Sequence, residues 1–110
     1  MSTHQFFGVQ VTLTASAIGN LLKLLQAVDS SIPPTVRSLR IQVDPSISSG
    51  TIYVGDAAVS ATRNGYAMVA SATTPPFLAF DTGSVQDVPL GAFFLFTTTA
   101  SVKINVLGWV

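Results

Sequence analysis

Two long segments of this chain alternate apolar and polar side chains with a period of two. Residues 6–14 place Phe, Val, Val and Leu at every second position from Phe7 onward, with Gly, Gln and Thr between them. Residues 102–110 begin with the same alternation, Val, Ile and Val against Lys and Asn. An α-helix repeats about every 3.6 residues and cannot keep such a series on one face, whereas successive side chains of a strand point to opposite faces. Both segments are therefore predicted to be β-strands with one buried face.

Shorter strands are predicted between these two segments, separated by loops rich in Gly, Pro and Ser. The predicted strands are 36–43, 51–54, 66–70, 77–80 and 92–98. Asn64-Gly65 is typical of a tight turn before the third of them. The run from Phe93 to Phe96 is apolar without a break, which predicts cover on both of its faces. Many short strands at this spacing favour a mostly all-β fold, a jelly-roll-like antiparallel β-sandwich.

One segment changes the period of the apolar pattern. Between residues 16 and 28 the apolar positions fall on one stripe of an α-helix. They are Ile18, Leu21, Leu22, Leu25 and Val28. Thr14 or Ser16 has a side chain suited to cap the start, and Asp29 followed by Pro33-Pro34 is expected to end the helix. We expect one short helix near residues 16–28, lying over the sheet.

The chain of 110 residues carries few charges. Asp, Glu, Lys and Arg make up 9% of it, while 48% of its residues are hydrophobic; an average soluble domain has about 25% charged residues. The formal net charge is zero, so no basic surface is predicted to attract nucleic acid. A neutral, apolar chain tends to associate, and we expect it to hide much of its surface in contacts. Residues 1–5 are expected to form a flexible arm and residues 6–110 a single domain.

A membrane-spanning segment is not expected. Two uncharged stretches, 64–80 and 88–102, are interrupted by Pro, Gly or Thr before about 20 apolar residues accumulate. The N-terminus has no basic start followed by an apolar segment, so no secretory signal is predicted. The chain has no Cys, which excludes disulfides and thiolate metal sites.

Catalytic and metal-binding patterns are weak in this sequence. The single histidine, His4, lies in the expected arm, and one His with scattered Asp does not supply the converging ligands of a metal site. Gly50 and Gly55 have the spacing of a phosphate-loop pair, but Asp56 stands where a Lys is needed. No Gly-x-Ser-x-Gly motif provides a nucleophile. We expect neither an enzyme nor a cofactor or metal site.

One motif points to a hydrolase. Phe80-Asp81-Thr82-Gly83-Ser84 resembles the active-site motif of aspartic proteases, in which two such Asp residues share a proton and activate water. The motif comes late in this chain, whereas retroviral-type proteases carry it early, with most of their lobe after it. Asp81 and Gly83 also suit the first and third positions of a type II β-turn. The turn is the favoured interpretation, and a homodimeric protease is the alternative.

Aromatic side chains are the candidates for a binding surface. Tyr53, Tyr66 and Trp109 could line a sugar-binding face, but we favour the interpretation that they fill the sandwich edges or a subunit interface. The residues expected at interfaces are Phe6, Phe7, Phe77, Phe80 and Trp109.

Taken in order, segments along nearly the whole chain resemble small virion proteins of tailed bacteriophages. The most telling segment is Gly-Thr-Ile-Tyr-Val-Gly-Asp at residues 50–56. The other matching segments are Val9–Thr14, Asn20–Leu25, Arg37–Val43, Val59-Ser60, Val88–Gly91 and Val102–Val106. None of these segments is a catalytic motif.

The resemblance implies a structural component of a virus particle. It implies a capsid decoration (cement) protein with a jelly-roll-like fold, which binds the major capsid protein on the outside of the shell as a homodimer or homotrimer and stabilises it. The alternative that it leaves open is a neck, tail or fibre component, for which binding to a receptor or carbohydrate is one role. Either role places the protein in the virion after synthesis in the cytoplasm of a bacterial host. The family has no motif that transfers binding residues to this chain.

Overall fold

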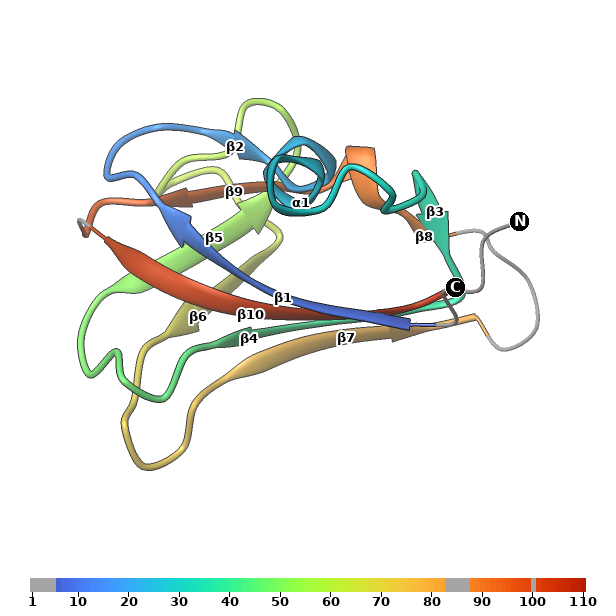
Figure 1. Cartoon of the computed structure of the whole chain (residues 1–110). Helices are drawn as coiled ribbons and strands as arrows, with labels where there is room; N and C mark the ends of the chain where they lie inside the picture. Colours follow the sequence, from blue (N-terminus) through green and yellow to red (C-terminus); the bar gives the residue numbers. More distant parts are fainter. Residues whose placement is uncertain (1–5, 83–87, 100) are drawn as a thin grey trace.

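The computed structural model describes residues 6–82, 88–99 and 101–110 and consists mainly of antiparallel strands (Figure 1). The first sheet, called the β1 sheet here, has the order β1-β10-β4-β7 and the second, the β5 sheet, has the order β2-β9-β5-β6. The strands of the β1 sheet are β1 (Phe6–Leu13), β10 (Val102–Trp109), β4 (Ser38–Val43) and β7 (Phe77–Asp81). Those of the β5 sheet are β2 (Gly19–Asn20), β9 (Phe94–Thr97), β5 (Thr51–Gly55) and β6 (Tyr66–Val69). A third sheet pairs β3 (Thr35–Val36) with β8 (Val88–Pro89).

The strand pairs are nested, which defines the topology. Counting inward from the two ends of the chain, β1 pairs with β10, β2 with β9, β3 with β8, β4 with β7, and β5 with β6. The chain is therefore one long antiparallel ribbon whose tip is the β5–β6 loop. The ribbon wraps on itself, so that β10 also pairs with β4 and β9 with β5. An eight-stranded double sheet wound in this way is a jelly roll, and the all-β sandwich predicted from the sequence is confirmed.

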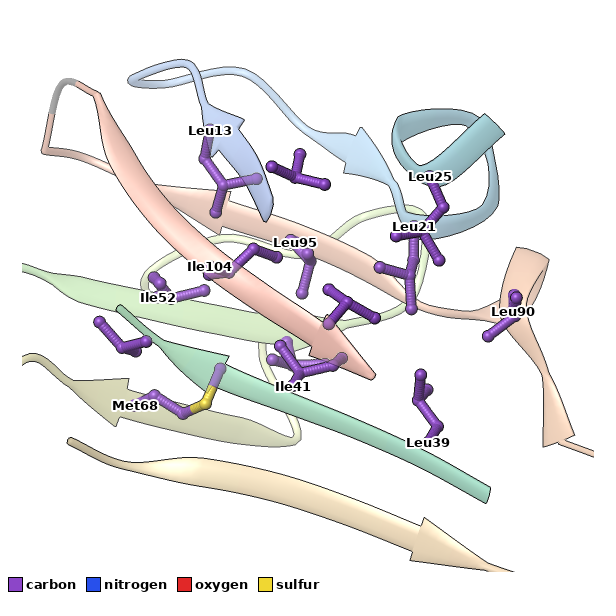
Figure 2. Packing of buried hydrophobic residues seen from close by; sticks show 14 of the residues in the cluster. Leu13, Leu21, Leu25, Leu39, Ile41, Ile52, Met68, Leu90, Leu95 and Ile104 are labelled. Carbon is purple, nitrogen blue, oxygen red and sulfur yellow. The ribbon is translucent and has the colours of Figure 1, made fainter. Parts of the chain in front are cut away.

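The inner faces of the two large sheets form the core (Figure 2). Leu39, Ile41 and Ile104 of the β1 sheet are at most 1% exposed, as are Ile52 and Leu95 of the β5 sheet. Burial of one such side chain stabilises the fold by about 1.5–3 kcal/mol. The one buried polar residue among those described, Thr97, donates its hydroxyl hydrogen to the carbonyl oxygen of Thr51 at 2.8 Å. The strict alternation in β4 and β10 thus matches the burial of every second residue.

A single α-helix is present, but it is shorter than predicted. Helix α1 spans Leu21–Val28, and Asn20, rather than Thr14 or Ser16, caps it by accepting a hydrogen bond from the Lys23 amide at 3.2 Å. Ser16 has a positive φ of 60° and donates its amide hydrogen to the Thr97 carbonyl at 2.7 Å, while Gly19 and Asn20 pair with β9. Residues 16–20 are therefore a turn and a strand.

Helix α1 closes one end of the sandwich, between the β5 sheet and the 3-10 helix η1 (Leu90–Ala92) (Figure 1). Its side chains Leu21 and Leu25 are fully buried. The Asn20 amide group also donates to the carbonyl oxygen of Gly91 at 2.9 Å. The same residue therefore begins the helix and ties it to η1.

The predicted tight turn at Asn64-Gly65 is not formed. Neither residue has the positive φ that a two-residue type I′ hairpin requires, and the loop between β5 and β6 extends over residues 56–65. This loop is held by an ion pair of 2.7 Å between Arg63 and Asp56 and by the Asn64 amide group, which donates to the Ser60 carbonyl at 3.3 Å. Asn64 and Gly65 are therefore part of a longer loop that is stabilised by side-chain hydrogen bonds.

Phe7 lies in the core, which corrects its assignment as an interface residue. It is 8% exposed and lies opposite Gly108 in the β1–β10 register. A Cβ atom on Gly108 would come within 2.2 Å of the Phe7 ring. The alternation of β1 turns Phe7 inward and Phe6 outward, and the missing side chain at position 108 provides the space for the ring.

We expect Gly108→Val to destabilise the fold by about 1–3 kcal/mol, because the new side chain overlaps the Phe7 ring in a packed core. Urea unfolding followed by circular dichroism measures the change. Gly8→Val is the matched control, since the nearest atom to a Cβ there is the Leu107 Cδ1 at 3.8 Å on the exposed face. Equal losses from both variants would show that the Phe7–Gly108 contact has no special role.

Candidate functional site

The exposed surface of the β1 sheet, called the outer face here, combines aromatic and polar side chains. The strand register places its residues in three rows that cross the sheet from β1 to β7. The rows are Phe6-Trp109-Ser38-Asp81, Gly8-Leu107-Arg40-Ala79 and Gln10-Asn105-Gln42-Phe77. The outer face is thus apolar at one end of the strands and rich in side-chain amides at the other.

An exposed aromatic pair marks the apolar end of the outer face. The rings of Phe6 and Trp109 stack at a centroid distance of 5.3 Å and an interplanar angle of 12°. They are 57% and 44% exposed although both are large and apolar. Cross-strand aromatic pairs stabilise a sheet by about 0.2–1 kcal/mol, which fixes the orientation of these rings. Phe6 covers one side of the indole, and the other side borders a hollow.

Two adjoining hollows lie on the outer face. The larger, of about 470 Å³, is lined by Gly8, Val9, Gln10, Arg40, Gln42, Asn105, Val106 and Leu107. The smaller, of about 260 Å³, is lined by Ser38, Leu39, Arg40, Ala79, Phe80, Asp81, Leu107 and Trp109. Arg40 and Leu107 belong to both hollows. Together the hollows form a shallow groove along the strands, called the outer groove here.

Arg40 lies at the centre of the outer groove without an anionic partner. Its guanidinium carbon is 4.0 Å from the centroid of the Phe77 ring, a cation–π contact. Among the described residues its side chain has no hydrogen bond or ion pair, since the one ion pair there joins Arg63 to Asp56. Gln42, beside it, also has an amide group with no hydrogen-bond partner in the described part of the chain. Both side chains are open to a ligand.

The polar end of the outer groove is organised by Asp44. Its Oδ1 accepts hydrogen bonds from the amide groups of Asn105 at 2.9 Å and Gln10 at 3.3 Å. Its Oδ2 accepts from the Ser46 hydroxyl and from the Ser46 amide at 3.1 Å. The Ser46 hydroxyl, and then Asn105, lower the pKa of Asp44 below its ordinary value of 3.8, with a smaller effect of nearby Lys103. The ionised carboxylate thus holds the two amides in place.

A second apolar surface lies where the two large sheets part, between the edge strands β6 and β7. Here a cleft of about 440 Å³, called the edge cleft, is lined by Val54, Gly55, Asp56, Gly65, Tyr66, Leu78, Phe80, Ala92 and Phe93. The Phe80 and Phe93 rings are 5.0 Å apart across it. The Tyr66 hydroxyl donates to the Phe77 carbonyl at 3.3 Å and so bridges the two strands.

The predicted interface residues fall into three places. Phe6, Trp109 and Phe77 lie on the outer face, while Phe80 lines both the smaller hollow and the edge cleft. Phe7 belongs to the core. Sequence analysis missed Leu107 and Arg40, which are central to the outer groove. The alternation of β10 and β4 in the sequence indicates that both side chains point away from the core. The strand register that makes them neighbours cannot be read from the sequence.

The three aromatic residues considered for a sugar-binding face do not come together. Trp109 lies on the outer face of the β1 sheet. Tyr53 is on the β5 sheet near Phe96, at a ring distance of 6.4 Å, and Tyr66 lines the edge cleft. The hypothesis of one sugar-binding site formed by all three residues is therefore wrong.

The weaker catalytic and metal-binding motifs lie partly outside the described residues. Asp81 ends β7 and accepts a hydrogen bond of 3.4 Å from the Ser38 hydroxyl, while Gly83 and Ser84 of its motif lie outside the described residues, as does His4. Within residues 6–82, 88–99 and 101–110, no three His, Cys, Asp or Glu side chains group as metal ligands. No helix in these ranges is long and apolar enough to span a membrane.

No protein-family model, curated protein or solved structure matches this chain.

We expect the Asp44 carboxyl to titrate below pH 3.8, because its hydrogen bonds stabilise the ionised form. Its contribution to stability is then fully present above the unfolded-state pKa and is lost as the pH falls through the lower folded-state pKa. Carbon-detected NMR titration of the folded protein measures the midpoint. Ser46→Ala removes the largest cause and is expected to move the midpoint back toward 3.8, so a midpoint unchanged in this variant would contradict the assignment.

Proposed function

We propose that the protein is a virion structural protein, a decoration protein that binds the outside of a tailed-bacteriophage shell as a homo-oligomer and stabilises it. The observation that carries this proposal is the edge cleft beside β7, whose outer edge pairs with no strand in the described part of the chain. Strand β7 ends the β1 sheet, and its exposed Phe77 and Phe80 are 47% and 37% accessible. Exposed apolar side chains beside a free strand edge are typical of surfaces that bind another protein.

The chemistry of β7 suits attachment by strand addition. An extended segment of a partner can form main-chain hydrogen bonds along β7 beyond the Phe77 carbonyl, which the Tyr66 hydroxyl already occupies. One of its apolar side chains can enter the edge cleft beside the Phe80–Phe93 ring pair. Natural edge strands usually carry charges or Pro that prevent such pairing. Within β7 the only charged residue is Asp81, at its end. The major capsid protein and a second copy of this chain are the partners that the proposal names.

Low charge and a closed core also support a structural role. A chain of zero net charge has no long-range field to steer a partner, so its contacts must be numerous and close. Many weak contacts repeated over a shell give firm attachment through multivalency. The resemblance to small phage virion proteins is the reason to propose that this shell is a bacteriophage capsid. The same resemblance covers neck, tail and fibre components, which differ in copy number.

We expect about one copy, or a simple large fraction of one copy, of this protein per major capsid subunit. Quantitative mass spectrometry of purified particles measures the ratio. A few to a few dozen copies per particle would move the protein to the neck, tail or fibres, and its absence from the particle would overturn the proposal.

We expect Phe80→Ser to weaken rebinding of the purified protein to shells that lack it by about 30-fold, since truncation of a central interface aromatic costs about 2 kcal/mol or more. Val28→Ser is the matched control, because Val28 is an exposed apolar residue, 56% accessible, on α1. Urea unfolding of both variants verifies that each is folded. Equal rebinding of the two variants would exclude the edge cleft as the attachment site.

A further inference from the structure

We propose that the outer groove binds an acidic glycan, a linear chain of sugars that carry carboxylate groups. The groove combines an unpaired cation, an exposed indole face and side-chain amides on one sheet surface. This function goes beyond attachment to a shell, because it uses the outer face of the β1 sheet rather than the edge cleft.

Arg40 supplies the charge selectivity. Its contact with the Phe77 ring holds the guanidinium against the sheet, while its N–H groups have no acceptor among the described residues. Two carboxylates lie near the ends of this face. Asp44 accepts hydrogen bonds from Ser46 and Asn105, and Asp81, which lines the smaller hollow, accepts one from the Ser38 hydroxyl at 3.4 Å. A planar guanidinium binds a carboxylate through two parallel hydrogen bonds, so a carboxylate supplied by the ligand is its natural partner.

Trp109 supplies a stacking surface for a sugar ring. Phe6 packs on the side of the indole toward β1, and the smaller hollow opens on the side toward β4. The floor of this hollow is lined by the small residues Ser38 and Ala79, which leave room above the sheet. Sugar rings have apolar C–H faces that pack against the electron-rich face of an aromatic ring.

The amide end of the outer groove matches hydroxyl groups. Hydroxyls both donate and accept hydrogen bonds, and so do the side chains of Gln10, Gln42 and Asn105. Gln42 has no partner in the described part of the chain, and Asp44 fixes the other two amides. A ligand that reaches from Trp109 past Arg40 to these amides must follow the strands, which an extended glycan chain does.

An acidic peptide is a poorer occupant of the same groove. Peptides bound to sheets gain much of their affinity by pairing their main chain with a free strand edge. The centre of the outer groove lies over β10 and β4, and both strands are already paired on each side. The groove therefore offers side chains alone, which suits a ligand whose polar groups are hydroxyls and carboxylates.

The test is isothermal titration of the whole protein with linear oligomers of galacturonate, glucuronate and mannuronate. Cello-oligosaccharides of the same length serve as the neutral probe. We expect binding to at least one acidic oligomer, weakened by salt, with at least tenfold lower affinity for the neutral probe. Failure to bind any of the three acidic oligomers, or equal binding of the neutral probe, would overturn the proposal.

Three substitutions separate the proposed roles. We expect Arg40→Gln and Trp109→Ala each to lower affinity for the acidic oligomer by about tenfold or more, and Arg40→Lys to recover part of the loss because it keeps the charge but not the fork. Arg63→Gln is the control, since Arg63 is an exposed arginine in the β5–β6 loop. The glycan proposal would also be overturned if Arg40→Gln left the affinity unchanged, or if Arg63→Gln lowered it as much as Arg40→Gln does.

The variant Tyr66→Ala keeps the two functions apart, because Tyr66 lines the edge cleft and neither hollow of the outer groove. Loss of shell binding with glycan affinity retained would support both sites. Glycan binding without any association with virus particles would support the outer groove and remove the shell proposal. Shell binding without glycan binding would support the shell proposal and overturn the glycan proposal.

Discussion

The antiparallel pairing of β1 with β10 is the interaction on which the rest of the structure depends. It joins Phe6 to Trp109 and runs in unbroken register to the pair Leu13–Val102. Because the strand pairs are nested, this outermost pair also positions β10 beside β4 and thereby completes the β1 sheet. Contacts this far apart in sequence are costly in loop entropy, but the cost grows slowly with length. In a nested ribbon each inner pair brings the next one close, so most of that cost is distributed over successive short closures.

The alternation in β1, β4 and β10 could be predicted from the sequence because it is a local property of each strand. The identity of the two faces followed from it, including the outward direction of Phe6. The start of the helix could not be predicted, since Ser16 to Asn20 depart from the helix only because they bond to β9, far along the chain. Asn64-Gly65 has a different cause: the loop before it has its own bonds, which include the Ser60 amide to the Arg63 carbonyl at 2.8 Å and the Asp56–Arg63 ion pair.

The candidate sites were less predictable than the fold, because each depends on strand register. Trp109 and Phe6 are neighbours only through the β1–β10 pairing, and Arg40 meets Phe77 only because β4 lies between β10 and β7. No periodicity in the sequence states which strands are adjacent. Phe7 illustrates the same limit in part: the alternation of β1 places it on the buried face, but only the register shows that Gly108 lies opposite and leaves room for its ring.

The distribution of charge separates the two surfaces that are open to ligands. In the edge cleft the lining is mainly apolar and aromatic, and its one acid, Asp56, is paired with Arg63. On the outer face, the central cation has no pair, and the carboxylates at its ends are held by hydroxyl and amide groups. Apolar surface with a free strand edge favours a protein partner, whereas an unpaired guanidinium among amides favours a hydrophilic anion. Arg40 is thus the charged group at the centre of the outer face, and its neighbours in the outer groove are amide, aromatic and aliphatic side chains.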